Sequence, residues 1–137
     1  TSGIGFNAAK NLVMDSRNNL FIIGNNKTKG ENAVKSLLQI SENKNISFIR
    51  CDLSSLKEIK KFFDVNKLPK LDVLVFSSEN IEKTFALNHL VYFLFTMIIL
   101  NKNLMKKNSK IINVASAAHW GVDLDFDNLE ITKNYSK

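Results

Sequence analysis

The sequence contains one cysteine, one proline and five glycines among its 137 residues. A single cysteine, Cys51, excludes an intrachain disulfide and a cysteine-based metal cluster, and we expect its side chain to be buried as a small apolar group. No run of about 18 or more apolar residues occurs, so a membrane-spanning helix is not expected. Charged residues make up 23% of the chain, too few for a disordered tail. Once these classes are excluded, the sequence predicts a globular domain.

Arginine is also scarce, because only Arg17 and Arg50 occur among 19 basic residues. Phosphate and base recognition favour the forked guanidinium group, and the lysines are scattered rather than gathered in a stripe. The net charge of +6 therefore does not indicate a nucleic-acid partner. Residues 1–5 have no basic region typical of a signal peptide, and together with the single thiol this favours a cytoplasmic location.

Short apolar runs alternate with amphipathic stretches along the whole chain. The pattern predicts strands at 19–24, 45–52, 71–75 and 110–116. It predicts helices at 5–15, at 29–42, from a cap at Ser54 or Ser55 towards Pro69, and at 81–107. Alternation of this kind is typical of the α/β class, a doubly wound parallel sheet of Rossmann type with helices on both faces.

A glycine turn, formed by Ser2, Gly3, Ile4 and Gly5, opens the first predicted helix. Glycines at such a turn let the backbone approach a pyrophosphate, and the helix N-terminus offers unpaired N–H groups to the anion. The alternative is a tight loop that binds no ligand. No phosphate-loop motif of the nucleotidase type occurs.

The end of the second predicted strand carries Gly24, Asn25 and Asn26. In a dinucleotide site this position meets the adenosine ribose, where an acid selects NAD. No acid is present here, and Lys27 and Lys29 follow, so the charges favour NADP slightly over NAD. The alternative is a solvated turn.

Several stretches match one family in order along the chain. They are TSGIG at 1–5, KGENA at 29–33, CDLSSLKEIKKF at 51–62, LDVLV at 71–75, FALNHLVYFLFT at 85–96 and KIINVASAAHW at 110–120. With these motifs the chain resembles the short-chain dehydrogenase/reductase family, and within it the retinol-dehydrogenase and WW-domain oxidoreductase-like branch.

The resemblance implies NAD or NADP as cofactor, with residues 2–5 lining its pyrophosphate. It implies that Asp52 and Leu53 lie against the adenine ring. It further implies that Asn88 holds a helix kink and a relay water, and that Ser116 hydrogen-bonds the substrate oxygen, where an O–H donor stabilises developing charge. The alternatives are an N-cap or turn role for Asp52 and Ser116, and a buried, satisfied amide for Asn88.

Two histidines, His89 and His119, have no acidic cluster beside them, so we expect both to be structural and expect no metal site. The stretch 85–100 is apolar all round, which predicts burial within a domain or against a partner. The resemblance implies that this helix forms a contact in a homo-oligomer.

The chain departs from the family pattern in three places. The opening strand and first glycine of the family turn would precede Thr1. After Val75 the family's Asn-Asn-Ala-Gly segment is replaced by residues 76–80, which look like the start of the next helix. The Tyr-x-x-x-Lys pair is missing, because Tyr135 has no lysine four residues on. These 137 residues alone should therefore be inactive.

We accordingly expect residues 1–137 to be a partial dinucleotide-binding Rossmann domain that lacks its first strand and its C-terminal part. The expected function is an NAD(P)-dependent oxidoreductase that interconverts an alcohol and a carbonyl on a small, hydrophobic substrate. The alternatives are a catalytically inactive binding or scaffold module of the same family and a flavodoxin-like regulatory domain. Either the chain is a short relative that lost catalysis, or it represents parts of a longer enzyme joined end to end, which we favour.

Overall fold

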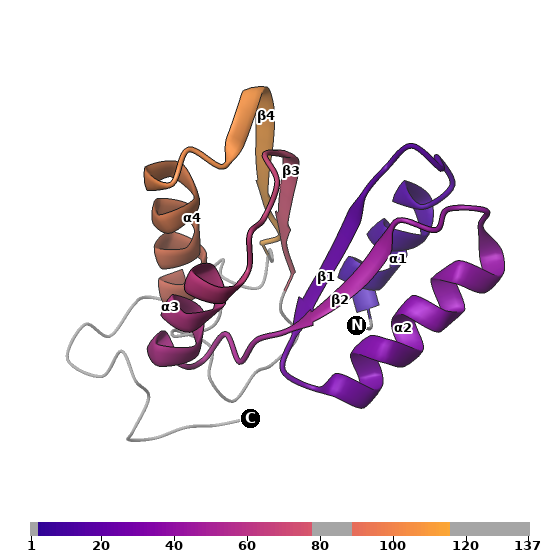
Figure 1. Cartoon of the computed structure of the whole chain (residues 1–137), viewed down its shortest axis with the longest axis horizontal. Helices are drawn as coiled ribbons and strands as arrows, with labels where there is room; N and C mark the ends of the chain where they lie inside the picture. The colour runs from indigo at the N-terminus through magenta and orange to yellow at the C-terminus, as the bar shows by residue number, and fades with distance from the viewer. Residues whose placement is uncertain (1–2, 78–88, 116–137) are drawn as a thin grey trace, which may run out of the picture.

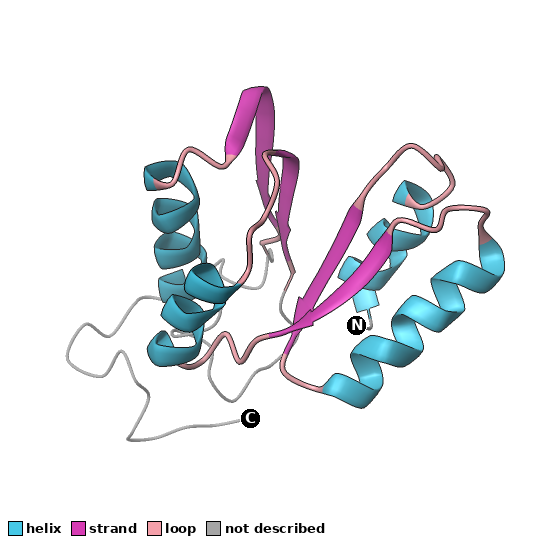
Figure 2. Cartoon of the chain, viewed as in Figure 1, coloured by secondary structure: helices cyan, strands magenta, loops and turns pink. Residues whose placement is uncertain are grey.

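The computed structural model describes residues 3–77 and 89–115, and strands and helices alternate along them (Figures 1 and 2). The elements are α1 (Gly3–Leu12), β1 (Leu20–Gly24), α2 (Lys27–Ile40), β2 (Ile46–Arg50), α3 (Leu56–Val65), β3 (Leu71–Phe76), α4 (Val91–Asn101) and β4 (Met105–Asn113). All strand pairs are parallel, which confirms the predicted α/β class.

The strands form two separate parallel pairs, as the sequence predicts for a doubly wound sheet that lacks its first strand. β1 pairs with β2, and β3 pairs with β4. In the strand order of a doubly wound sheet, these pairs are the second and third strands and the fourth and fifth strands. The position of the first strand lies between β1 and β3, and the described residues place no strand there. This explains why the sheet is divided.

Helices cover both faces of the first strand pair. Leu20 and Ile22 of β1 pack with α1 and α2 in a cluster built around Ala9, Val13, Leu37 and Ile46. Ile23, on the opposite face of β1, packs on a second cluster that α3, β3 and α4 share. The members of this second cluster are Cys51, Ile59, Phe62, Phe63, Phe76, Val91, Phe95 and Ile99. The continuously apolar strand therefore serves two hydrophobic layers, as expected for a parallel sheet.

The last helix and strand differ most from the predicted ranges. α4 ends at Asn101, whereas the sequence predicted a helix to Lys107. Asn103 adopts a positive φ of 51°, and the Leu104 N–H donates to the Ile99 carbonyl at 2.9 Å. This left-handed residue ends the helix, because asparagine tolerates that conformation far better than most residues. β4 therefore begins at Met105, before the predicted start at Lys110.

Phe76 also corrects a prediction. The sequence placed it at the start of the helix after Val75, but it is the last residue of β3 and pairs with Asn113. Its ring is buried and stacks on Tyr92 with a centroid distance of 4.6 Å. The Phe76 ring buries more apolar area at the end of the strand than it would at an exposed helix start.

Asn43 ties the loops of the first strand pair together. It is fully buried, and its Nδ2 donates to the carbonyls of Asp15 at 3.1 Å and Asn18 at 2.9 Å. Its Oδ1 accepts from the Asn45 N–H at 2.7 Å. One side chain thus satisfies three backbone groups on both loops that lead into β1 and β2.

Candidate functional site

The carboxyl ends of the strands and the start of α1 meet at one edge of the molecule (Figure 1). Gly5, in the first turn of α1, lies against Ser77, the residue after β3. A Cβ built on Gly5 would lie 3.3 Å from the Ser77 Cβ. Larger residues at position 5 would therefore push α1 away from the end of β3. In open α/β sheets, this edge is where ligands bind.

The glycine turn lies at the N-terminus of α1, as predicted. Gly3 is the first residue of the helix and has a φ of 61°, a backbone conformation that side chains disfavour. Ile4 is 61% exposed, so this end of the helix is open to solvent. The N–H groups of the first turn have no partner within the helix and carry its positive dipole end. Ser2 lies outside the described residues.

The turn after β1 is built by two asparagines with different tasks. Asn26 is the N-cap of α2, where its Oδ1 accepts from the Lys29 N–H at 2.9 Å. Asn25 is exposed beside it. The nearest ion pair, between Lys27 and Glu31, is long at 3.8 Å. The position that meets the ribose in a dinucleotide site therefore carries an exposed amide and no carboxylate.

The turn after β2 is held rigid by its own side chains. Ser54 donates to the Asp52 Oδ1 from its N–H at 2.9 Å and from its Oγ at 2.6 Å. The Asp52 N–H donates to Glu58 at 2.9 Å. Asp52 is half-buried and has this turn role whether or not it also meets a ligand. Leu53 is half-buried against the second hydrophobic cluster, so only part of its side chain can meet an adenine ring.

Glu58, in the first turn of α3, contacts this turn and was missed by the sequence prediction. It accepts from the Asp52 N–H, and it also lies 3.4 Å from the Arg50 guanidinium. Ser55 is the N-cap of α3 and accepts from the Glu58 N–H at 3.3 Å, which confirms one of the two predicted caps. The Ser-x-x-Glu spacing of a capping box could have identified Glu58.

Cys51 is buried, as predicted, at the start of this turn. Burial, reinforced by the nearby Glu58 carboxylate, raises the pKa of its thiol from 9.0 to about 11. The thiol stays protonated at neutral pH and is a poor nucleophile. In the part of the chain that the structure describes, which includes His89, no group of three or more potential ligand side chains could hold a metal ion.

Ser116 and Asn88, the predicted catalytic residues, lie outside the described residues, as does His119. The structure places the segment that leads to Ser116. The Val114 N–H donates to the Phe76 carbonyl at 3.0 Å, so the chain leaves β4 beside the end of β3. Ser116 follows two residues later, and its predicted role stays a prediction.

The described residues fit a dinucleotide. Gly3 and Gly5 leave the α1 N-terminus accessible, the Asn25 amide lies after β1, and the Asp52 turn lies after β2. These three turns follow neighbouring positions of the doubly wound order, at the same sheet edge. A family model described as short chain dehydrogenase matches residues 1–122. The chain belongs to the short-chain dehydrogenase family.

Curated relatives support the predicted branch of this family. The chain is 30% identical to human polyprenol dehydrogenase over 155 aligned positions, which cover 99% of this chain and 46% of the relative. It is 29% identical to human retinol dehydrogenase 13, with 93% of this chain and 42% of the relative covered. The chain thus spans about half the length of these short-chain dehydrogenases.

A solved structure supports the fold. The chain superposes on a protein of unassigned function from Mycobacterium paratuberculosis with a TM-score of 0.70 and 22% sequence identity. The match covers 98% of this chain and 50% of the solved one. The two separate strand pairs therefore have the arrangement of a larger α/β domain.

No helix within the described ranges is both long and apolar enough to cross a membrane. α4 is instead divided between two environments. Val91, Phe95 and Ile99 are buried in the second hydrophobic cluster. Tyr92, Leu94 and Ile98 are partly buried against the same cluster. Leu90 just before the helix and Phe93, Met97 and Leu100 within it are exposed.

Proposed function

We propose that the protein is an NAD(P)-dependent oxidoreductase that interconverts an alcohol and a carbonyl on a small, hydrophobic substrate. The observation that carries this proposal is the position of the α1 N-terminus. Gly3 and Gly5 open that helix directly beside Ser77, at the edge where parallel strands end. Family membership supports the same chemistry, because the family model is that of a dehydrogenase.

The binding roles follow from the three turns. Residues 2–5 would bind the pyrophosphate through backbone N–H groups and the helix dipole. Asn25 would meet the ribose, and the Asp52–Leu53 turn would meet the adenine ring. Glu58 is a positioning residue, because it acts by holding the backbone of Asp52.

NADP is favoured over NAD by the charges after β1. No carboxylate follows Gly24 directly, and Lys27 and Lys29 are exposed at the start of α2. A 2′-phosphate would meet cations and the helix N-terminus there, rather than the acid that selects the free ribose hydroxyl.

Two predicted residues would act on the substrate. When bound at the α1 N-terminus, a nicotinamide cofactor would supply the hydride chemistry. Ser116 would donate a hydrogen bond to the substrate oxygen, where negative charge develops, and Asn88 would hold a water of the proton relay. The proton itself requires an acid, and the tyrosine–lysine pair that the family uses is absent from these 137 residues.

The relatives guide the choice of substrate. Their names specify polyprenol and retinol, both apolar alcohols. We propose a substrate of this chemical class. Leu90, Phe93, Met97 and Leu100 form an exposed apolar stripe on α4. This stripe would pack against a second copy of the chain, because apolar side chains spaced by three or four residues lie on one face of a helix.

Turnover of retinal by the intact protein tests the proposal. The retinol formed is measured by chromatography, and the NADPH dissociation constant is measured separately. Ser116→Ala should lower the rate by about a hundredfold or more and leave NADPH affinity within about twofold. Ser36→Ala, an exposed change on α2, is the matched control. NADPH binding without turnover of any aldehyde would identify a binding module instead.

A further inference from the structure

The outer edge of β2 carries a feature that the oxidoreductase function does not use. Two hydrogen bonds define how β2 pairs with β1. The Leu20 N–H donates to the Asn45 carbonyl at 2.8 Å, and the Cys51 N–H donates to the Gly24 carbonyl at 2.9 Å. In a parallel ladder, alternate residues of a strand bond to one neighbour. The odd-numbered residues from 45 to 51 therefore direct their backbone groups at β1.

The remaining residues of β2 face the other way. The backbone N–H and C=O groups of Ile46, Phe48 and Arg50 point away from β1. Within residues 3–77 and 89–115, no strand pairs with this edge. In the doubly wound order, β2 is the outermost strand of its half, so a strand inserted between β1 and β3 would leave this edge open. An open edge is a template for an added strand.

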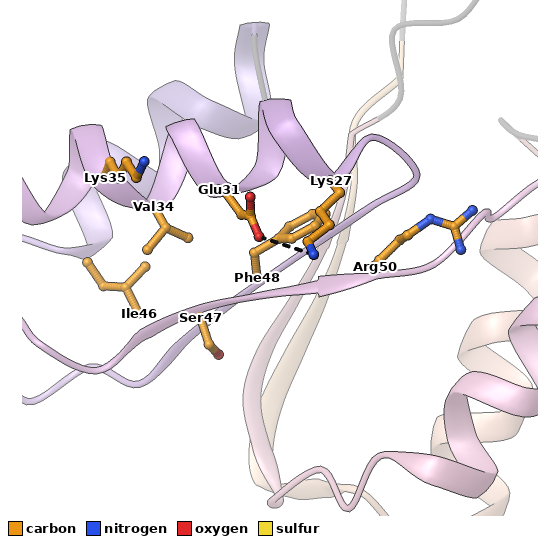
Figure 3. A pocket seen from close by; sticks show the side chains of 8 residues that line it. All are labelled: Lys27, Glu31, Val34, Lys35, Ile46, Ser47, Phe48 and Arg50. Atoms are coloured by element: carbon orange, nitrogen blue, oxygen red, sulfur yellow. Dashed lines mark ion pairs between the residues drawn. The ribbon is translucent and has the colours of Figure 1, made fainter.

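A groove of about 460 Å³ runs along this edge between α2 and β2 (Figure 3). Its apolar wall is made by Val34 of α2 with Ile46 and Phe48 of β2. The side chains of Ile46, Phe48 and Arg50 share the face towards α2, whereas Ser47 points to the opposite face. The outward backbone groups and the apolar groove thus belong to the same three residues of β2.

The groove is positively charged at both ends. Lys35 lies near Ile46, and Lys27 lies towards Arg50 (Figure 3). Glu31 is the acidic residue of the lining, and it is paired with Lys27 at 3.8 Å. Among the described residues, no carboxylate lies within 4.0 Å of the Lys35 ammonium group. The partner that complements this groove is therefore acidic.

We propose that the outer edge of β2 binds an extended acidic peptide segment of another protein as an added strand. Backbone groups of Ile46, Phe48 and Arg50 hydrogen-bond the peptide. An apolar side chain in its middle fills the groove beside Val34. Carboxylates two residues before and after that side chain reach Lys35 at one end and Lys27 at the other, because residues i and i+4 of a strand are about 13 Å apart on one face.

A five-residue probe tests this proposal on the intact, nitrogen-15-labelled protein. The probe is acetyl-Glu-Thr-Val-Thr-Glu-amide, and the readouts are amide chemical shifts and fluorescence anisotropy of a labelled copy. Saturable shifts should centre on the amides of Ile46, Phe48 and Arg50. Lys35→Glu should weaken the affinity by about fivefold or more. Lys61→Glu, the same charge change on the exposed face of α3, should alter it less than about twofold.

Two control peptides separate strand addition from simple charge attraction. The peptide with N-methylated internal amides should not bind, because it cannot form the ladder. The Lys-Thr-Val-Thr-Lys peptide should not bind either. Binding that survives N-methylation, or an affinity that Lys35→Glu leaves unchanged, would overturn the proposal. So would occupation of this edge by a second copy of the protein.

Discussion

Phe48 of β2 lies against Gly30 of α2, and its ring fills the space that a side chain at position 30 would need. Gly30 is buried within the helix, where its N–H donates to the Asn26 carbonyl at 3.0 Å. A Cβ at this position would overlap the ring. We expect Gly30→Ala to lower the free energy of unfolding by about 1–3 kcal/mol, as overpacking does, although alanine is the better helix former.

Urea unfolding of a double-mutant cycle checks this contact. In a Phe48→Ala background the overlap is gone, so Gly30→Ala should now stabilise the protein by about 0.5–1 kcal/mol through helix propensity. The sign of the effect should reverse between the two backgrounds. If Gly30→Ala has the same effect in both backgrounds, the Phe48 ring is not the reason that position 30 requires glycine.

Asn43 gives a second stability prediction. Asn43→Ala leaves the carbonyls of the half-buried Asp15 and Asn18, and the Asn45 N–H, without their side-chain partner. We expect a loss of about 2–4 kcal/mol in the free energy of unfolding, since each buried group left unpaired costs about 1–3 kcal/mol and water can reach some of them. Asn32→Ala, an exposed change on α2, should cost less than about 0.5 kcal/mol. Equal losses of stability in the two variants would show that Asn43 does not hold the loops before β1 and β2 together.

Cys51 predicts a pH dependence at the alkaline end. Its pKa is raised from 9.0 to about 11 in the folded protein, so the folded state retains the proton where the unfolded state loses it. Its contribution to stability is complete below pH 9 and falls as the pH rises towards 11. Cys51→Ala should flatten this part of the stability profile. An unchanged slope between pH 9 and 11 would show that the thiol does not titrate there.

The same thiol should react slowly in the native state. At pH 8, its thiolate fraction is about a hundredfold lower at a pKa of 11 than at 9.0, before burial is considered. Labelling by an aromatic disulfide reagent should accelerate at least that much in denaturant. Rapid labelling of the folded protein would mean that the Cys51 region opens.

The exposed stripe of α4 predicts how association can be broken. Phe93 is 65% exposed, whereas Phe95 is buried in the core. Phe93→Glu should convert a dimer to a monomer in sedimentation experiments without changing the unfolding temperature of the monomer by more than a few degrees. Phe95→Ala should instead destabilise the fold by about 3–5 kcal/mol. If the wild-type protein sediments as a monomer at micromolar concentration, the proposed dimer contact on α4 is wrong.

Hydrophobic periodicity predicted every described element of this fold, because each strand and helix carries an apolar run of which at least part is buried. Periodicity did not predict that α4 ends at Asn101 and β4 begins at Met105, because the apolar pattern continues past the left-handed turn at Asn103. Phe76 was misplaced because a single aromatic residue fits a strand end or a helix start equally well in the sequence. The glycine turn could be predicted from chemistry, but the packing of Gly5 against Ser77 depends on residues far apart in the chain.

The binding of NADPH and NADH to the intact protein, measured by calorimetry, decides whether the glycine turn is a cofactor site. We predict saturable binding with the tighter affinity for NADPH. Gly5→Val should weaken it by about tenfold or more, because its side chain would press on Ser77 and cover the helix N-terminus. Asn7→Val, the same side chain at an exposed position of α1, should retain the wild-type affinity. Absence of binding by the wild-type protein, or equal affinity of the Gly5→Val variant, would contradict the assignment.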